Sequence, residues 1–379
     1  EISLGLVGSE MCIRDRYKAS VIVTLSNEYA LTENFFNNLI QIINNDINIF
    51  AVVDGQTDKQ SYCFLSEIQK KYPNISVLYT QENIGYSKAN NKGAYLSTSP
   101  YLIFLNSDTF PIEDSLYKLI KFMDDNPNVG VTQGLILYPQ NNLVQSAGHI
   151  FGFYKTTHAF DGLNPQNDIV QKTAERQALG SGFYITRRKL FLQEGGFNEL
   201  FYNAWEGLEF SLKLHNKGYK CIYYPQAKAY HVKGSGRNRR FRDETYQTGY
   251  FWHQWGDKIK IDIPDIYQMQ LCELDYKYEY LLINGSSIRE EIWSILLENL
   301  PFKIISQYNI EKSMSKSTIS LEDSVPSSFL QSKTNLLFVT DNYRDIINNY
   351  RIFTMRAAFT SHDLILDLNG NVIHLTQYK

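Results

Sequence analysis

Short apolar runs alternate with segments of helical spacing through the first third of the chain. The apolar runs cover residues 19–25, 47–54, 75–80 and 101–108. Between them, apolar positions recur at helical spacing in residues 32–43, 58–71 and 87–96. Buried strands that alternate with helices are typical of a parallel sheet covered on both faces. The pattern therefore predicts an α/β fold for this part of the chain.

Polar residues lie at or just beyond the ends of three predicted strands. They are Asp54, Asn83 and Asp108. Ligands of open α/β sheets bind outside the carboxyl ends of the strands. This placement indicates a nucleotide-type site at that edge of the sheet.

The pattern changes after residue 264. Residues 270–300 have helical spacing, and residues 313–332 are rich in Ser, Thr and acidic residues, as in a linker. A new strand–helix–strand pattern begins at residue 333. The domains predicted are 1–16, an extraneous segment without periodicity; 17–264, the main domain; 265–332, a helical connector and linker; and 333–379, the truncated start of a second α/β domain.

Net charge, cysteine spacing and the length of the apolar runs exclude several classes of function. The net charge of −3 gives no basic field for nucleic acid. The four cysteines form no C-x-x-C pair, which indicates a reducing compartment and a cytoplasmic location. No apolar run in the sequence is long enough to cross a bilayer. The 27 Tyr and 22 Phe residues suit a core, and they also suit surfaces that stack on sugar rings.

Two residues are candidate ligands of a divalent metal. Asp108 follows a buried strand, where a carboxylate is costly without a partner. His231 ends the strand-like segment CIYYPQAKAY and precedes the basic, Gly-rich loop KGSGRNRR. Mg²⁺ or Mn²⁺ suits a carboxylate, a second protein ligand and phosphate oxygens. The alternatives are a helix cap near Pro111 for Asp108 and an ordinary strand-end histidine for His231.

Two carboxylates are candidates for a general base. The segment NAWEGLEFSLKLHNKGY has helical spacing and a stop at Gly218, which places Glu206 at the start of a helix and Glu209 one turn later. Carboxylates at that end also stabilise the helix dipole, so capping alone is the alternative. A base for an acceptor hydroxyl is the functional interpretation.

Five segments, taken in order, resemble a family 2 glycosyltransferase of the GT-A fold, a family that includes rhamnosyltransferase-like and polypeptide-GalNAc-transferase-like members. They are VIVTLSNE, AVVDGQTD, ENIGYSKANNKG, FLNSDT and LGSGFYITRRKLFLQEGGFNELFYNAWEGLEFSLKL. The resemblance covers residues 19–235 and implies a Rossmann-like sandwich with a mixed, mostly parallel sheet. It implies donor-binding roles for Thr24, Asn27, Glu28, Asp54, Asn83, Gly85, Asn91, Asn106, Ser107, Lys233 and Arg237.

The resemblance implies an inverting transfer from a UDP-, dTDP- or GDP-sugar to a glycan or lipid-linked saccharide. Such an enzyme would serve bacterial surface polysaccharide synthesis, and contact with the inner face of a membrane is left open. The metal ligands implied are Asp108 and His231. Many relatives carry Glu-Asp where this chain has Glu206-Gly207, and the missing aspartate is their base. Glu206 is therefore the first candidate base and Glu209 the second.

Three other functions are alternatives to this interpretation. A sugar-nucleotide pyrophosphorylase would carry a Gly-rich basic loop after the first strand, and a dinucleotide-binding dehydrogenase would carry G-x-G-x-x-G there; the chain reads LSNEYALTEN. A catalytically inactive nucleotide-sugar or glycan binding module is favoured only by Gly207.

The segment NLLFVTDNYRDIINNYRIFTMRAAF resembles the opening of a GT-B-type glycosyltransferase, which would make the intact protein a chain with two transferase domains.

Overall fold

The computed structural model describes residues 17–25, 28–152, 155–232, 244–263, 265, 278–284, 304–310, 320–321, 325–340, 343–359, 362–367 and 372–375. These residues form two compact units. The N-terminal unit comprises residues 1–149 and 160–259, and the C-terminal unit comprises residues 150–159 and 260–379. The predicted segment 1–16 lies outside the described residues. The predicted domain boundaries stay predictions.

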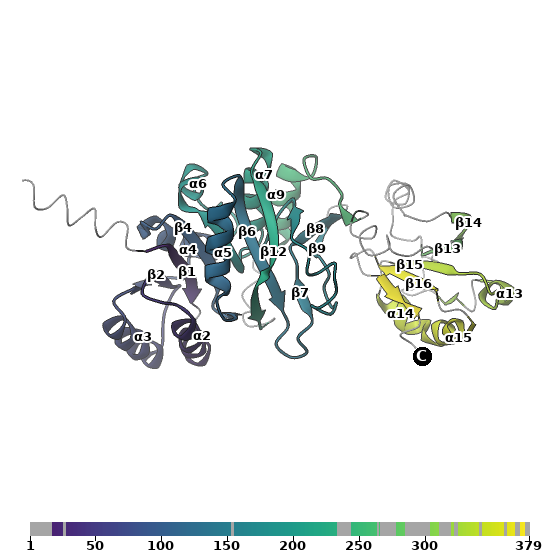
Figure 1. The fold of residues 1–379 in the computed structure, drawn as a ribbon, viewed down its shortest axis with the longest axis horizontal. Helices are drawn as coiled ribbons and strands as arrows, with labels where there is room; N and C mark the ends of the chain where they lie inside the picture. The colour runs from purple at the N-terminus through teal and green to yellow at the C-terminus, as the bar shows by residue number, and fades with distance from the viewer. Residues whose placement is uncertain are drawn as a thin grey trace, which may run out of the picture. The chain divides into compact units, whose positions relative to one another are not determined.

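The N-terminal unit is built on a ten-stranded mixed sheet, counted over the described residues (Figure 1). Its main path runs β10-β12-β6-β11-β4-β1-β2-β3, with β5 beside β12 and β7 beside β6. The strands are β1 (Ala19–Leu25), β2 (Ile47–Val53), β3 (Ile75–Tyr79), β4 (Tyr101–Asn106), β5 (Thr109–Pro111), β6 (Val129–Leu137), β7 (Val144–Ser146), β10 (Ala174–Arg176), β11 (Phe183–Arg187) and β12 (Lys220–His231).

The first four long strands are parallel, as the alternating pattern predicted. β1 pairs in parallel with both β2 and β4, and β2 pairs in parallel with β3. β11 then enters antiparallel between β4 and β6. Strands β1, β2 and β4 therefore present their carboxyl ends at one edge of the sheet.

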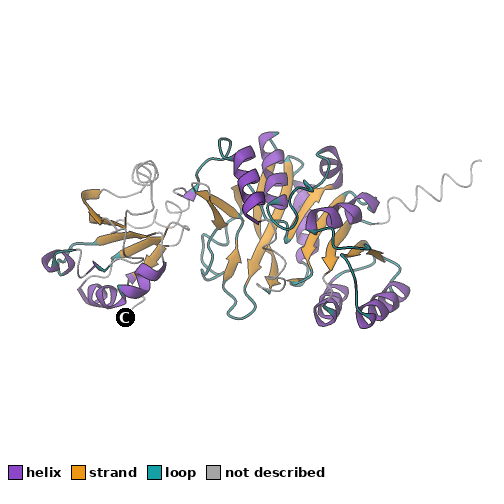
Figure 2. Ribbon diagram, turned by 180° about the vertical axis from the view of Figure 1, so that it is seen from behind, coloured by secondary structure: helices purple, strands orange, loops and turns teal. Residues whose placement is uncertain are grey.

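Helices cover both faces of this sheet (Figures 1 and 2). They are α2 (Tyr29–Ile42), α3 (Lys59–Lys71), α4 (Tyr86–Leu96), α5 (Ser115–Asp125), α6 (Arg188–Gln193), α7 (Glu206–Asn216) and α9 (Glu244–Trp255). Successive strand residues point to opposite faces, so each strand feeds two cores. One core holds α2, α3 and α5, and the other holds α4, α6 and α7.

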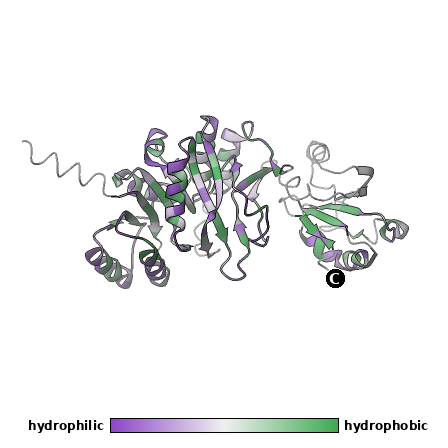
Figure 3. Ribbon diagram, viewed as in Figure 1, coloured by the Kyte–Doolittle hydropathy of each residue, from purple (hydrophilic) through white to green (hydrophobic). Residues whose placement is uncertain are grey.

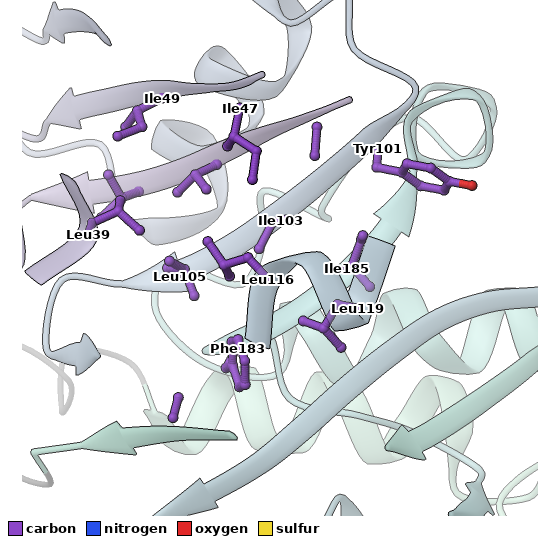
Figure 4. Close-up of a cluster of buried hydrophobic side chains, with 14 of the residues drawn as sticks. Leu39, Ile47, Ile49, Tyr101, Ile103, Leu105, Leu116, Leu119, Phe183 and Ile185 are labelled. Atoms are coloured by element: carbon purple, nitrogen blue, oxygen red, sulfur yellow. The ribbon is translucent and has the colours of Figure 1, made fainter. Parts of the chain in front are cut away.

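Figure 4 shows part of the first core. Leu116 and Leu119 of α5 lie beside Ile103 of β4 and Ile185 of β11, and Leu39 of α2 lies over the neighbouring strands. All five side chains are buried. The opposite core gathers the alternate positions of the same strands. This two-sided burial explains why the strands read as nearly continuous apolar runs.

Helix boundaries differ in places from the sequence prediction. α2 begins at Tyr29, not at Thr32, and Thr32 is buried inside the helix. α3 begins after Asp58, whose carboxylate caps it by accepting from the Ser61 N–H at 2.9 Å. Residues Thr109–Pro111 form β5, so Asp108 caps no helix at Pro111. α7 ends before Gly218, which has a φ of 86°, as predicted.

The C-terminal unit contains a second, five-stranded sheet of order β14-β13-β15-β16-β17 among its described residues. The strands are β13 (Tyr278–Asn284), β14 (Ile304–Ile310), β15 (Leu336–Thr340), β16 (Leu364–Asp367) and β17 (Val372–His374), and only β17 is antiparallel. The helices are α13 (Ser327–Leu330), α14 (Tyr343–Asn348) and α15 (Tyr350–Phe359). A separate strand pair, β8 (His149–Gly152) with β9 (Lys155–His158), precedes it in the chain.

The strand–helix–strand pattern predicted from residue 333 is confirmed by β15, α15 and β16, whose strands are coloured hydrophobic in Figure 3. The helix expected over residues 270–300 is wrong at Tyr278–Asn284, because β13 lies between β14 and β15. Ladder partners on both sides override a weak local preference. In this unit the fully buried Arg356 forms an ion pair with Asp363 at 2.6 Å.

Among the described residues, no helix combines the length and the apolar character that a membrane crossing requires.

Candidate active site

Asp54 lies directly after β2, at the carboxyl edge of the sheet. Its side chain is buried, and its two oxygens accept the N–H groups of Ile84 at 2.8 Å and Gly85 at 3.0 Å. Oδ1 also accepts from the Thr80 hydroxyl at 3.3 Å, whereas Oδ2 keeps a further lone pair that could accept an N–H from a ligand. Asp54 therefore fixes the loop that leads into α4 while retaining acceptor capacity.

Gly85 allows that loop to pass beneath Tyr202. Its φ is 87°, and a Cβ at this position would lie 2.6 Å from the Tyr202 ring. The Tyr202 hydroxyl donates to Oδ1 of Asn83, and the Tyr202 carbonyl accepts from Tyr86 N at 2.7 Å. Asn83, Gly85 and Asp54 thus meet at one place, and their predicted contact with a donor stays a prediction.

Asn91 has a different environment. Its amide donates to the Phe197 carbonyl at 2.9 Å and accepts from the Phe197 N–H at 2.8 Å. Both polar ends of this buried side chain are committed to one backbone unit. Asn91 therefore anchors the segment before α7, and its predicted contact with a donor stays a prediction.

The remaining donor-binding candidates fall at the ends of β1 and β4 or outside the described residues. Thr24 of β1 pairs in register with Asn106 of β4, and Ser107 follows it. Glu28 is exposed immediately before α2. Asn27, Lys233 and Arg237 lie outside the residues that the structure describes.

Asp108 and His231 come together although 123 positions separate them in the sequence numbering, 231 − 108. The antiparallel pairing of β5 with β12 sets His231 opposite Thr109, and Nε2 of His231 lies 3.2 Å from Oδ1 of Asp108. Both side chains are largely buried. The Asp108 carbonyl also accepts from Val232 N at 3.0 Å. The fold therefore builds the pair that the sequence proposed.

The donor set suits a divalent cation. Two ligands in adjacent octahedral positions at 2.0–2.2 Å from a metal are about 3 Å apart, which matches the 3.2 Å between Nε2 and Oδ1. Within the described part of the chain, no group of three His, Cys, Asp or Glu side chains could hold a metal. Asp108 and His231 would thus be two ligands of a shell completed by phosphate oxygens and water.

Glu206 opens α7 and is held by Ser181. The Ser181 hydroxyl donates to Oε1 of Glu206 at 2.7 Å, and the glutamate side chain is buried. The preceding Trp205 has a φ of 73°, which costs about 1–3 kcal/mol in a non-glycine residue. Its ring packs on Phe251 of α9 with centroids 4.4 Å apart, so packing compensates for the strained backbone.

Glu209 is bound differently from Glu206. Nζ of Lys213 lies 2.9 Å from its Oε2, and Nδ2 of Asn198 donates to its Oε1 at 3.3 Å. A carboxylate that is paired with a lysine one turn away has a structural role in the helix. Among the described residues, Glu209 therefore forms an ion pair within α7.

Ser181 and Gly182 connect the end of β4 to Glu206. The Gly182 carbonyl accepts from Asn106 N at 3.1 Å, and a Cβ on Gly182 would lie 3.0 Å from the Asn106 amide. The neighbouring Ser181 binds Glu206. The end of β4, which leads to Asp108, is therefore connected to Glu206, the candidate base, through the two adjacent residues Ser181 and Gly182.

Gly207 has a packing reason. A Cβ there would lie 2.6 Å from Ser181 N and 2.7 Å from Ser181 Cβ. The glycine allows α7 to approach the backbone of Ser181 closely. An aspartate in this position, as in many relatives, has no room in this arrangement.

We predict that Gly207→Ala destabilises the N-terminal unit by about 1–3 kcal/mol, because the added methyl overpacks against Ser181. Urea denaturation followed by tryptophan fluorescence measures the change. Gly249→Ala in α9 is the control, since a Cβ there meets nothing within 4 Å. The control is expected to be neutral or to gain up to about 1 kcal/mol from helix propensity. Equal stability of Gly207→Ala and wild type would contradict the packing argument.

The aromatic residues before α7 are mostly part of the packing. Phe201 is fully buried, and Trp205 packs on Phe251 and Trp252. Gln247 of α9 accepts from Tyr202 N at 2.8 Å. This loop is therefore held on two sides, by α4 and by α9.

Sequence reasoning did not identify three residues of the site: Ser181, Tyr202 as the partner of Asn83, and Gln145, whose Oε1 meets Nδ1 of His231. Ser181 lies in the segment LGSGFYITRR, and the resemblance of that segment to the family was a signal that could have identified it. Gln145 carried none, because its contact depends on strand pairing.

Comparison with known proteins finds similarity within the N-terminal unit. Residues 20–191 match the model of Glycosyl transferase family 2. The O-antigen biosynthesis protein RfbC of Myxococcus xanthus is 24% identical over 233 residues, which cover 59% of this chain and only 18% of that protein. An N-acetylglucosaminyl-diphospho-decaprenol L-rhamnosyltransferase of Mycobacterium tuberculosis is 24% identical over 229 residues, covering 55% of this chain and 73% of the relative.

A crystal structure of GalNAc-T7 with UDP, GalNAc and Mn²⁺ aligns at 16% identity with a TM-score of 0.49, covering 57% of this chain and 44% of the other. The family match agrees with the resemblance in the sequence, and the mixed, mostly parallel sheet with helices on both faces agrees with the predicted fold class. Residues 20–191, which supply most strands of the ten-stranded sheet, therefore match glycosyl transferase family 2, the family that the sequence resembles.

Proposed function

We propose that this protein is an inverting, metal-dependent glycosyltransferase that moves a sugar from a nucleoside-diphosphate-sugar to an acceptor hydroxyl. The observation that carries the proposal is the link through Ser181 and Gly182. It brings the strand end before Asp108 close to the carboxylate of Glu206. A direct displacement of a diphosphate requires a metal site and a general base close together, here at one edge of the sheet.

Glu206 is the proposed base. It lies at the start of α7 and its Oε1 accepts one hydrogen bond from Ser181, which orients the carboxylate. Glu209 is engaged with Lys213 and Asn198. The Glu206 carboxylate would take the proton from the acceptor hydroxyl as the oxygen attacks the anomeric carbon from the face opposite the diphosphate. That geometry inverts the configuration at the anomeric carbon.

Asp108 and His231 would hold Mg²⁺ or Mn²⁺, which supplies positive charge to the leaving diphosphate when bound. Asp54 would accept an N–H from the nucleobase, with Asn83 and Gly85 shaping the same pocket. Thr24, Glu28, Asn106 and Ser107 would complete the donor side. The basic loop with Lys233 and Arg237 is the proposed second contact of the diphosphate and lies outside the described residues.

The names of the relatives support a role in polysaccharide synthesis. One is an O-antigen biosynthesis protein, and another transfers L-rhamnose to a decaprenyl-linked saccharide by its name. We propose a nucleotide-activated hexose or deoxyhexose as donor and a glycan or lipid-linked saccharide as acceptor, in the synthesis of a bacterial surface polysaccharide. The cytoplasmic location and peripheral membrane contact stay predictions.

The test is a donor screen with the full chain over UDP-, dTDP- and GDP-sugars, with and without Mn²⁺. We expect release of one nucleoside diphosphate that depends on the metal, and a product of inverted anomeric configuration by NMR. Binding of a nucleotide-sugar without turnover under any condition would instead identify an inactive binding module. Absence of binding to every donor would refute the proposal.

A further inference from the structure

Gln145 is a buried residue of β7 that contacts His231 at two points. Its Nε2 donates to the His231 carbonyl at 3.1 Å, and its Oε1 meets Nδ1 of the same histidine. No other contact of the His231 ring nitrogens is found among the described residues except Nε2 with Asp108. Both polar ends of the Gln145 side chain therefore contact His231.

A β-bulge aims Gln145 at His231. In the antiparallel pairing of β7 with β6, Val144 faces Leu137 and Ser146 faces Ile136, so two steps along β7 match one step along β6. Gln145 is the extra residue between these pairs. A bulge re-aims the side chain of its extra residue, and bulges are frequent beside active sites. The regular alternation of the strand does not determine where this side chain points.

The two hydrogen bonds fix the orientation of the amide and thereby the proton on the ring. A carbonyl can only accept, so the Gln145 atom that faces the His231 carbonyl is the NH₂ group. The amide oxygen then faces Nδ1 and must receive a hydrogen from it. In a neutral imidazole, a hydrogen on Nδ1 leaves Nε2 with a lone pair. Nε2 lies 3.2 Å from the Asp108 carboxylate, so in this neutral form its lone pair could bind a cation held between the two side chains.

We propose that Gln145 is a positioning residue that holds the His231 ring with Nδ1 on its amide oxygen and Nε2 toward Asp108, and so keeps the Asp108–His231 pair arranged for a divalent cation. The inference rests on the proposed metal-dependent function. Without Gln145, the ring could carry its hydrogen on Nε2 and donate it to Asp108. Both atoms that would bind the metal would then be occupied by each other.

Two variants of the full chain separate this role from packing. Gln145→Met keeps the approximate length of the side chain and removes both hydrogen bonds. Gln145→Glu keeps an oxygen that accepts from Nδ1, but it replaces the donor to the His231 carbonyl with a second oxygen and adds a negative charge. We expect Gln145→Met to weaken Mn²⁺ binding about 10–100-fold, as loss of an outer-shell partner does, and Gln145→Glu to retain an affinity close to that of wild type.

Titration of Mn²⁺ followed by electron paramagnetic resonance measures the affinity, with thermal unfolding without metal as the stability control. A second readout needs no metal: long-range ¹H–¹⁵N spectra of the chelator-treated protein report the tautomer of each neutral histidine. The His231 signal is identified by its loss in His231→Ala. We expect the Nδ1–H form in wild type and Gln145→Glu, and the Nε2–H form in Gln145→Met.

The outcomes distinguish the inference from the proposed function. If wild type binds Mn²⁺, Asp108→Asn does not, and Gln145→Met binds like wild type with an unchanged tautomer, the role of Gln145 is refuted while the metal site stands. If wild type itself binds no Mn²⁺, with or without a nucleoside diphosphate, the metal-dependent function fails and this inference fails with it.

Discussion

Glu206→Gln is expected to lower kcat by about 10²–10⁴-fold, the range that loss of a general base produces. The substitution keeps the shape of the side chain, and the amide oxygen can still accept from Ser181 Oγ. The KM for the donor is expected to change little, because Glu206 is assigned to the acceptor hydroxyl. Steady-state kinetics with the donor found in the screen, together with thermal unfolding, measure both effects.

Glu209→Gln is the matched control for this prediction. The two glutamates lie one turn apart on α7 and are both buried, but only Glu209 forms the ion pair with Lys213 at 2.9 Å. We expect its substitution to affect stability more than kcat. Full activity of Glu206→Gln, or an equal loss of kcat in both variants with the fold intact, would show that Glu206 is not the base.

Asp108→Asn is expected to abolish the metal-dependent part of the turnover. The charge that a bound cation supplies is worth several kcal/mol in the transition state, and each 1.4 kcal/mol is a tenfold change in rate. A loss of about 10²–10³-fold therefore follows. The variant keeps the side-chain volume, so a fall in Mn²⁺ affinity without a fall in melting temperature is the signature.

Asp124→Asn provides the comparison for Asp108. Asp124 is also an aspartate with a side-chain partner, since it accepts from the Tyr101 hydroxyl at 2.6 Å, and it lies on α5 outside the site. Its substitution is expected to leave turnover unchanged. If Asp108→Asn retained full metal-dependent activity, the assignment of the Asp108–His231 pair as a metal site would be wrong.

The sequence by itself determined the α/β class and the match of residues 20–191 to glycosyl transferase family 2. Strands buried on both faces must be apolar along their length, so β1, β2 and β4 were visible as uninterrupted runs. Helical spacing over residues 58–71 predicted α3 correctly, and the structure shows that Asp58 caps its start. The start of α2 was missed because no side chain caps it, and a buried threonine resembled a cap.

Local patterns failed where pairing partners far along the chain decide the structure. Tyr278–Asn284 became a strand because two parallel neighbours complete its ladders. Likewise, the sequence did not show whether Gly207 indicates a catalytically inactive protein. The structure gives a packing reason instead, since Ser181 lies where its side chain would be.

The tertiary structure alone decided how the candidate site is assembled. Asp108 and His231 were each identifiable from the end of an apolar strand, but their 3.2 Å approach follows from the pairing of β5 with β12. The hydrogen bond between Ser181 and Glu206 follows from the packing of α7 against the segment before β11. Gln145 reaches His231 only through a bulge, and a bulge depends on the register between two strands. Side-chain type and burial are local properties that a sequence records, whereas contacts across the sheet depend on strand order and register, which are set when the whole chain packs.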